Sequence, residues 1–288
     1  MVGNLIRKLI VLFGIDRLLP VIVNGKPLNA FICKFIPYPV HYRQPTYRVI
    51  YRNSIKFNVD LSDHMQWLIY FGHEVENRKA LYGLLDKKYQ ILDVGANVGE
   101  TALNMSKIAG PGSNVVAIEA NSSTFNLLEE NCRANPALIV NRINVGLSDE
   151  EGAMSIKRKT DRNKGADQLM AIDSSIGHDA NQVRVKTIDN LIQENLLSSS
   201  IDLIKIDVEG MELQVLKGAK QLLLKSTPTL FFEFSENQFA GYNYSGQDIF
   251  SFLKQFNYQF VDASNMNEVR NSADIIGHTD IIATQAKG

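Results

Sequence analysis

The stretch Ile91-Leu-Asp-Val-Gly-Ala-Asn-Val-Gly-Glu100 decides the fold, because an apolar strand runs directly into glycines and then into a helix. Gly95 allows a tight turn and a close approach of a ligand to the backbone, and Gly99 lets the helix lie near the strand. This order of elements is typical of nucleotide-binding units. We therefore expect a ligand site at the carboxyl end of the strand, with Gly95, Ala96, Asn97 and Gly99 around the ligand.

Outward from this stretch, short apolar runs alternate with helix-length segments. Seven runs are predicted to be strands, at residues 90–94, 114–119, 139–147, 203–208, 229–234, 259–262 and 280–284. Helices are expected at residues 63–71, 76–85, 99–108, 122–134, 212–224 and 246–256. Apolar strands joined by helices imply parallel strands that are covered on both faces. The sequence therefore predicts a doubly wound α/β fold with a seven-stranded sheet, whose last two strands form an antiparallel pair.

The chain is expected to consist of an N-terminal α/β extension, residues 1–60, and a main domain, residues 61–288, with an insertion near 154–182. Tyr47 to Asp60 alternates like a hairpin around Asn53-Ser54. Leu5 to Val23 is apolar but carries four charged residues, so it is too interrupted to span a membrane. This segment is predicted to be either an amphipathic helix packed on the body or a helix lying on a membrane surface, near a lipid-linked substrate.

Composition gives no general attraction to nucleic acid, because 30 basic and 31 acidic residues leave a formal net charge of -1. The two cysteines, Cys33 and Cys132, are far apart and favour neither a disulfide framework nor a zinc site, so a reducing, cytoplasmic location is expected.

A local basic run covers residues 157–164. It is interpreted either as a solvated hairpin tip or as a lid that holds a phosphate of the substrate.

Three polar residues at predicted strand ends indicate the chemistry of the ligand. Asp93 precedes Gly95 by two positions, where a carboxylate would repel a pyrophosphate but suits an ammonium group, such as that of S-adenosylmethionine. Glu119 ends the second strand, where a carboxylate can accept hydrogen bonds from both ribose hydroxyls. Ser148 follows the third strand and is expected at the edge of the adenine. A nucleoside cofactor with a cationic group is therefore predicted.

The fourth strand carries three charged residues, Lys205, Asp207 and Glu209, on one face of an otherwise buried run. Burial of such groups costs several kcal/mol unless they are paired or serve a site. Either Lys205 pairs with a carboxylate and stabilises the sheet, or Asp207 binds the cofactor's amino acid end or the substrate while Glu209 orients or deprotonates the acceptor. Glu233 ends the fifth strand and is a further candidate for the wall of the site.

The histidines do not form a metal-binding pattern, since neither HxH nor HExxH occurs. His73 is interpreted either as an ordinary surface residue or as a catalytic base. A divalent metal is compatible with Asp207, but the segment Ser235-Glu236-Asn237 fits a catechol-type metal site only loosely. No metal site is therefore predicted.

Three motifs together resemble the FkbM-type methyltransferases: DVGANVG at 93–99, IKIDVEG at 204–210 followed by VLKGA at 215–219, and VGLSD at 145–149. The resemblance covers roughly residues 60–265. It implies a class I methyltransferase fold, S-adenosylmethionine as donor, and O-methylation of a hydroxyl, often on a sugar or natural-product scaffold.

The resemblance also implies two further cofactor-binding residues. Glu74 corresponds to the glutamate of an aromatic-Glu-Pro element that precedes the first strand in the family, although Val75 replaces its proline. Ala120 follows Glu119 where the family favours proline, which changes the detail of the adenine pocket.

Two other functions share parts of this pattern. A nicotinamide oxidoreductase would have the same fold and Glu119, but Asp93 and the lack of GxGxxG argue against it. A non-catalytic nucleoside-binding subunit would keep the glycine loop and lose the acceptor chemistry. The predicted acceptor is a hydroxyl group of a small molecule, glycan or glycolipid, either free or in a phosphorylated or lipid-linked form.

Overall fold

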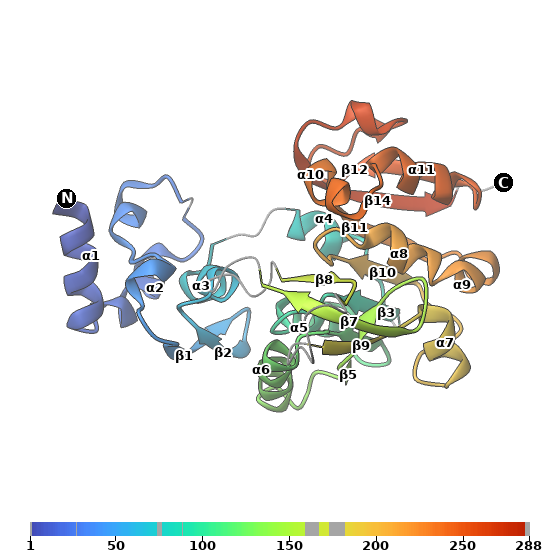
Figure 1. Cartoon of the computed structure of the whole chain (residues 1–288). Helices are drawn as coiled ribbons and strands as arrows, with labels where there is room; N and C mark the ends of the chain where they lie inside the picture. The colour runs from blue at the N-terminus through green and yellow to red at the C-terminus, as the bar shows by residue number, and fades with distance from the viewer. Residues whose placement is uncertain are drawn as a thin grey trace.

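The computed structural model describes residues 2–26, 28–73, 77–87, 89–158, 167–172 and 182–285. Figure 1 shows a large sheet with helices around it, and an N-terminal segment at one end of the molecule. The helix α3 (His64–Phe71) lies between that segment and the large sheet. The termini are at opposite ends of the view.

The large sheet has eight strands and contains all the parallel strands that the sequence predicts. In spatial order they are β13 (Glu268–Val269), β12 (Tyr258–Asp262), β14 (His278–Gln285), β11 (Thr229–Ser235), β10 (Leu203–Ile206), β3 (Gln90–Val94), β4 (Asn114–Ile118) and β5 (Val140–Ile143). Strands β11, β10, β3, β4 and β5 are mutually parallel, and β14 is antiparallel to both β11 and β12. The predicted α/β fold is confirmed. The count of seven is wrong because β13, with two residues, is too short to give an apolar pattern.

Helices cover both faces of this sheet. They are required because successive side chains of a strand point to opposite faces, and the strands are apolar at nearly every position. One core includes Ile91 and Leu203, and the other includes their neighbours Leu92 and Ile204. The helices that contribute to the first core are α3, α4 (Arg78–Gly83), α5 (Glu100–Ala109) and α6 (Ser122–Arg133). Those of the second are α7 (Ile188–Gln193), α8 (Glu212–Lys217), α9 (Lys220–Lys225), α10 (Glu236–Phe239) and α11 (Gly246–Lys254).

Two predicted elements are each divided in the structure. The run 139–147 forms β5 and then β6 (Gly146–Leu147), which belongs to a second sheet with β9 (Gln182–Lys186), β7 (Gly152–Lys157) and β8 (Gln168–Met170). The predicted helix 212–224 is divided into α8 and α9 at Gly218. A Cβ at Gly218 would lie 2.1 Å from the carbonyl oxygen of Ser148, so this glycine permits close contact between the helical layer and β6.

The N-terminal segment contains the predicted hairpin, β1 (Tyr47–Arg52) and β2 (Ile55–Asp60). Asn53 and Ser54 both have positive φ, at 50° and 61°, as the two-residue turn requires. The predicted N-terminal helix is instead three pieces, α1 (Val2–Leu12), the 3-10 turn η1 (Ile15–Arg17) and α2 (Leu19–Val23), because Gly14 adopts a left-handed conformation. The 3-10 turns η2 (Phe31–Phe35) and η3 (Pro39–His41) follow. The division into 1–60 and 61–288 stays a prediction.

The hairpin is tied to the main sheet through α6. The backbone N–H groups of Lys56 and Asn58 on β2 donate to the side-chain oxygens of Asn135 and Asn131, at 2.9 and 2.7 Å. The N-terminal cap of α3 is Asp63, whose carboxylate accepts a hydrogen bond from the backbone N–H of Gln66 at 3.1 Å.

At the centre of the large sheet, one buried ammonium group joins β3 and β10. The Lys205 side chain is 2% exposed, and its Nζ lies 3.3 Å from Asp93 and 3.2 Å from Asp207. The same Nζ donates to the carbonyl oxygen of Gly95 at 3.0 Å. Lys205 therefore neutralises two carboxylates and holds the first residue of the glycine turn in place.

Replacement of Lys205 by methionine keeps the length of the side chain but leaves Asp93 as an uncompensated buried charge. We expect Lys205→Met to lower the free energy of unfolding by about 3 to 5 kcal/mol, measured by urea denaturation. A second exchange, Asp93→Asn, recovers part of the loss. The exposed Lys225→Met is the control, and equal stability of the two single variants would show that the buried pair is not needed.

Candidate functional site

A cavity of about 480 Å³ opens at the carboxyl ends of β3, β4, β10 and β11, the size of an ordinary small-ligand site. Of the residues predicted from sequence to bind or react, these line it: Gly95, Ala96, Asn97, Glu119, Ala120, Asp207, Glu209 and Glu233. These eight residues therefore meet in one place, although they come from four different strands or the loops that follow them. Their individual roles stay predictions.

The glycine loop forms one side of the cavity. Gly95 has φ +73°, and a Cβ there would lie only 1.8 Å from the carbonyl oxygen of Asp207, so the two loops pass in direct contact. Asn97 also adopts a positive φ, and its buried Oδ1 has no hydrogen-bond partner among the described residues. An unpaired buried oxygen costs free energy, so it is a suitable acceptor for a ligand hydrogen. Gly99 does not line the cavity; a Cβ there would lie 2.6 Å from Leu128, so it permits helix packing.

Glu119 is held in a single orientation at the end of β4. Its two carboxylate oxygens accept hydrogen bonds from the backbone N–H groups of Asn97, at 3.0 Å, and Asn121, at 2.8 Å. Burial raises the pKa of Glu119 to about 7, despite these hydrogen bonds. The carboxylate that the sequence predicts for ribose hydroxyls thus faces the cavity in a fixed position.

Asp93 and Ser148 lie behind the wall of the cavity. Asp93 is fully buried, pairs with Lys205, and accepts a hydrogen bond from the Thr101 hydroxyl at 2.5 Å. The ammonium group beside Asp93 therefore belongs to the protein itself. Ser148 is also buried and bonds to Asp149, while its neighbours at 145–147 line the cavity as an apolar wall.

His73, which follows α3, falls outside this arrangement. His73 is not among the lining residues; its ring stacks on Trp67, with centroids 5.4 Å apart, and its Nδ1 lies 3.1 Å from the Lys26 carbonyl oxygen. Burial lowers the pKa of His73. A role of His73 as a base stays a prediction, and its ring is engaged by Trp67 and Lys26. Glu74 and residues 159–164 of the basic run lie outside the described residues.

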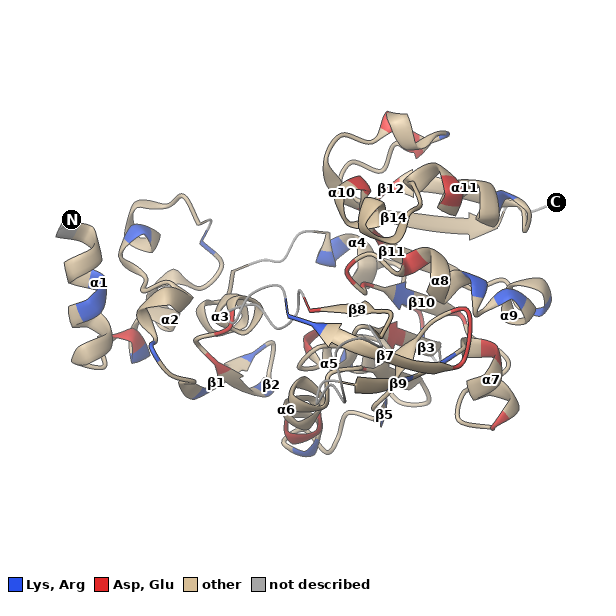
Figure 2. Ribbon diagram, viewed as in Figure 1, with Lys and Arg blue, Asp and Glu red and all other residues tan. Residues whose placement is uncertain are grey.

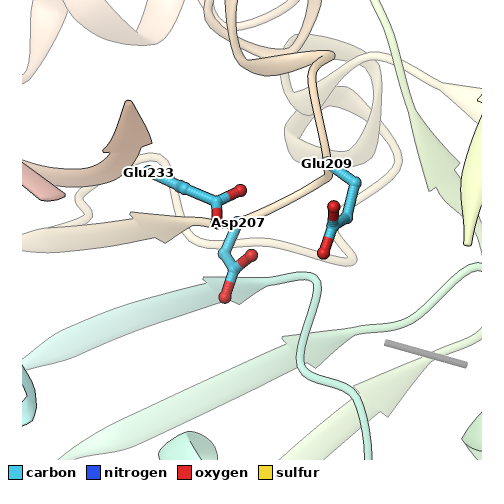
Figure 3. A group of neighbouring side chains, drawn as sticks. All are labelled: Asp207, Glu209 and Glu233. Carbon is cyan, nitrogen blue, oxygen red and sulfur yellow. The ribbon is translucent and has the colours of Figure 1, made fainter. Parts of the chain in front are cut away.

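Three carboxyl groups, those of Asp207, Glu209 and Glu233, face one another across the cavity (Figure 3). One oxygen of each lies within 4.8 Å of the others. Glu209 has a left-handed backbone conformation, φ 57°, which is rare for a residue of this kind and concentrates at functional sites. Its Oε2 accepts a hydrogen bond from Gln238 Nε2 at 2.7 Å. These oxygens can share a proton, accept hydroxyl hydrogens or contribute to a cation's coordination.

The charge states in this cluster differ between its members. Burial disfavours the charged form of Asp207, but Lys205 and Arg78 outweigh this, so the pKa of Asp207 is lowered. Burial, reinforced by the negative charges of Asp207 and Glu209, raises the pKa of Glu233 to about 10. At neutral pH the cluster therefore holds a proton on Glu233 while Asp207 is ionised.

Hydrogen bonds to Glu212 hold the turn that carries Asp207 and Glu209. This fully buried carboxyl group accepts from the backbone N–H of Val208 at 3.1 Å, and Tyr244 donates to the carbonyl oxygen of Gly210 at 2.8 Å. Burial raises the pKa of Glu212 to about 7. The glutamate at the second position after the IKIDVEG motif thus has a structural role in shaping the cavity.

Arg78, His278 and Asp280 are among the polar residues of the cavity that sequence reasoning missed. Arg78 pairs with Glu100 at 3.3 Å, and His278 Nε2 lies 3.4 Å from Glu233. Burial raises the pKa of Asp280 to about 6. Asp280 reaches the cavity because it is paired with Glu233 in the antiparallel register of β14 and β11. The apolar run 280–284 predicts the strand, but this register is not evident from sequence.

Comparisons with known proteins bear on this site. The family model described as "Methyltransferase FkbM domain" matches residues 93–260. The Hexuronic acid methyltransferase AglP of Haloferax volcanii is 32% identical over 133 residues, which are 46% of this chain and 50% of that protein. Methyltransferase 1 of Beauveria bassiana is 28% identical over 144 residues, 44% of this chain and 57% of that protein. The chain thus spans about half the length of the curated relatives it matches.

Among solved structures, a SAM dependent methyltransferase from Aquifex aeolicus is similar with a TM-score of 0.42 and 13% identity, over 73% of this chain and 90% of that chain. The family model covers more than half of the chain, from Asp93 near the end of β3 to Phe260 in β12. The expectations of a methyltransferase and of S-adenosylmethionine as its methyl donor are confirmed at the level of the family. The chain belongs to the FkbM methyltransferase family.

Proposed function

We propose that this protein transfers a methyl group from S-adenosylmethionine to a hydroxyl oxygen of a sugar-containing acceptor. The proposal rests on one observation: a single cavity has two ends that differ in chemistry. One end has the glycine loop and Glu119, and the other has the carboxyl cluster of Asp207, Glu209 and Glu233.

The residues at the first end fit the nucleoside part of the donor. The Glu119 carboxylate can accept hydrogen bonds from two adjacent ribose hydroxyls, and Asn97 Oδ1 can accept a further one. Ile118, Val145 and Leu147 supply an apolar wall for a flat base. The ionised Asp207 lies where it can attract the ammonium of the donor's amino acid end. When bound, S-adenosylmethionine supplies an electrophilic methyl group on a positively charged sulfur.

The second end fits an acceptor rich in hydroxyl groups, because carboxyl groups accept hydroxyl hydrogens. Methyl transfer forms a bond from the acceptor oxygen to carbon while the carbon–sulfur bond breaks, and the hydroxyl proton must leave. We assign Glu209 to orient that hydroxyl and accept its proton, since its oxygens line the cavity beside Asp207. Glu233, protonated at neutral pH, is suited to donate a hydrogen bond to the acceptor.

A sugar is favoured over other hydroxyl compounds by the concentration of polar groups. Besides the carboxyl groups, Arg78 and His278 provide donors in the same wall. The hexuronic acid named for the Haloferax volcanii relative is a sugar, which supports this class. The proposal includes free sugars, glycans and glycolipids.

Donor binding is expected to depend on pH through Glu119. Its raised pKa, about 7, means that the carboxylate is mostly ionised at pH 8 and mostly protonated at pH 6. Since the ionised form accepts both ribose hydroxyls, S-adenosylhomocysteine should bind about tenfold more weakly at pH 6 than at pH 8. Titration calorimetry at the two pH values measures this.

The Glu119→Gln variant provides the control, because it should bind more weakly at pH 8 and lose most of the pH dependence. Binding of NAD in place of S-adenosylhomocysteine would contradict the methyltransferase proposal and favour an oxidoreductase.

Methyl transfer is expected to depend on Glu209 more than donor binding does. Glu209→Gln should lower kcat by about a hundredfold or more, because an amide cannot take the hydroxyl proton. Transfer of label from the donor to a panel of sugars, glycolipids and other hydroxyl compounds gives kcat, and calorimetry gives the affinity for S-adenosylhomocysteine.

Glu150→Gln is a matched exposed control and should leave both quantities unchanged. An unchanged kcat in Glu209→Gln would exclude Glu209 as the proton acceptor, and binding without transfer to any acceptor would favour a non-catalytic subunit.

A further inference from the structure

The first 50 residues differ in charge from the rest of the chain. They contain seven Lys and Arg residues and one acidic residue, Asp16, which leaves +6 in this segment and -7 in residues 51–288. Asp16 is buried and pairs internally with Arg48 at 3.5 Å. Figure 2 accordingly shows more blue than red segments along the ribbon from α1 to β1. A chain that is nearly neutral as a whole therefore has a strongly basic end.

The same segment exposes most of the large apolar side chains. Of the 21 that are exposed in the described part of the chain, 15 lie between Leu5 and Tyr51. Leu12, Phe13 and Val21 are 74%, 70% and 87% exposed. Single exposed apolar residues are ordinary, whereas such a concentration marks an interaction surface.

Helix α1 shows how the two properties combine. Leu5, Leu9 and Leu12 are spaced at i, i+4 and i+7, so they fall on one face of the helix, and all three are exposed. Ile10, on another face, is buried against the η1 and η2 side of the segment. Lys8 is exposed beside the leucine stripe. An outward apolar stripe flanked by lysine is the pattern of helices that lie in a membrane interface.

We propose that this N-terminal surface, formed by Leu5, Lys8, Leu9, Leu12, Phe13 and Val21, docks on an anionic lipid bilayer. The apolar side chains enter the boundary of the acyl region, and the basic residues attract anionic head groups. The docking is peripheral, since no helix in the described ranges has the length and apolar character to cross a bilayer. Symmetric pairing of two copies through this surface would instead bring two basic segments together, which costs electrostatic energy.

The position of this surface has a consequence for the cavity. Leu28, exposed in the N-terminal segment, lines the cavity, as do His64, Met65 and Leu68 of α3. The N-terminal segment that carries this surface therefore also contributes to the wall of the cavity. Delivery of a lipid-linked acceptor from the bilayer rests on the proposed function, whereas the docking itself does not.

Co-sedimentation of the full chain with vesicles tests the docking without donor or acceptor. We expect binding to phosphatidylcholine vesicles that contain about 30% phosphatidylglycerol, and little binding to phosphatidylcholine alone. Raising the salt from about 0.1 M to 0.5 M should weaken the binding, because exposed charges are screened. The triple exchange Leu12→Ser, Phe13→Ser and Val21→Ser should weaken it by at least about tenfold.

A matched control replaces three exposed apolar residues elsewhere, Leu224→Ser, Met266→Ser and Ile276→Ser, which are 60%, 62% and 97% exposed. This variant should bind like the wild type, and circular dichroism confirms that both variants fold. Equal binding of the two triple variants, or equal binding to neutral and anionic vesicles, overturns the proposal. So does a dimer, seen by light scattering, that the N-terminal exchanges dissociate while no form of the protein binds vesicles.

Discussion

The contact of Lys205 with Asp93 and Asp207 is the constraint on which the rest of the site depends. An ammonium group between two carboxylates in the middle of a parallel sheet is tolerated because each charge has a partner. The bond from Lys205 to the Gly95 carbonyl fixes the turn against Asp207. Burial, reinforced by the ionised Asp207, raises the pKa of the neighbouring Glu233, which holds its proton at neutral pH. One pairing thus sets both the shape of the glycine loop and the charge pattern of the acceptor wall.

The parts of the site that sequence could predict are those set by strand ends. Glu119 follows an apolar run, and the carboxyl ends of parallel strands meet at one edge, so its place in the cavity follows from pattern alone. For the charged run 205–209 the structure shows the pairing of Lys205, while the roles of Asp207 and Glu209 stay predictions. Lys205 forms the structural pair, while Asp207 keeps a side chain that is 35% exposed and faces the cavity. The spacing of residues along a strand shows which side chains lie on the same face of the sheet, but not which of them form ion pairs there.

The parts that sequence could not predict depend on contacts between distant segments. Ser148 was expected at the cavity, but the pairing of β6 with β9 turns residues 145–147 toward it instead. Asp93 was expected beside a cationic ligand, and the protein's own lysine occupies that position. The strand β13 has only two residues, and the N-terminal helix is interrupted at the single residue Gly14. Features this short do not change the pattern of apolar residues over the ten or more positions from which a strand or helix is predicted.

Because of the place of β14 in the sheet, one part of the cavity wall is synthesised after all the rest. β14 comes after every other strand of the large sheet along the chain, yet it inserts between β12 and β11. The glycine loop, Glu119 and Asp207 are all made well before it, whereas His278 and Asp280 arrive with it. The earlier residues, together with Glu209 and Glu233 of the acceptor end, are therefore synthesised before the part of the cavity wall that β14 supplies. Insertion of this strand completes the enclosure, so the cavity closes only as the sheet does.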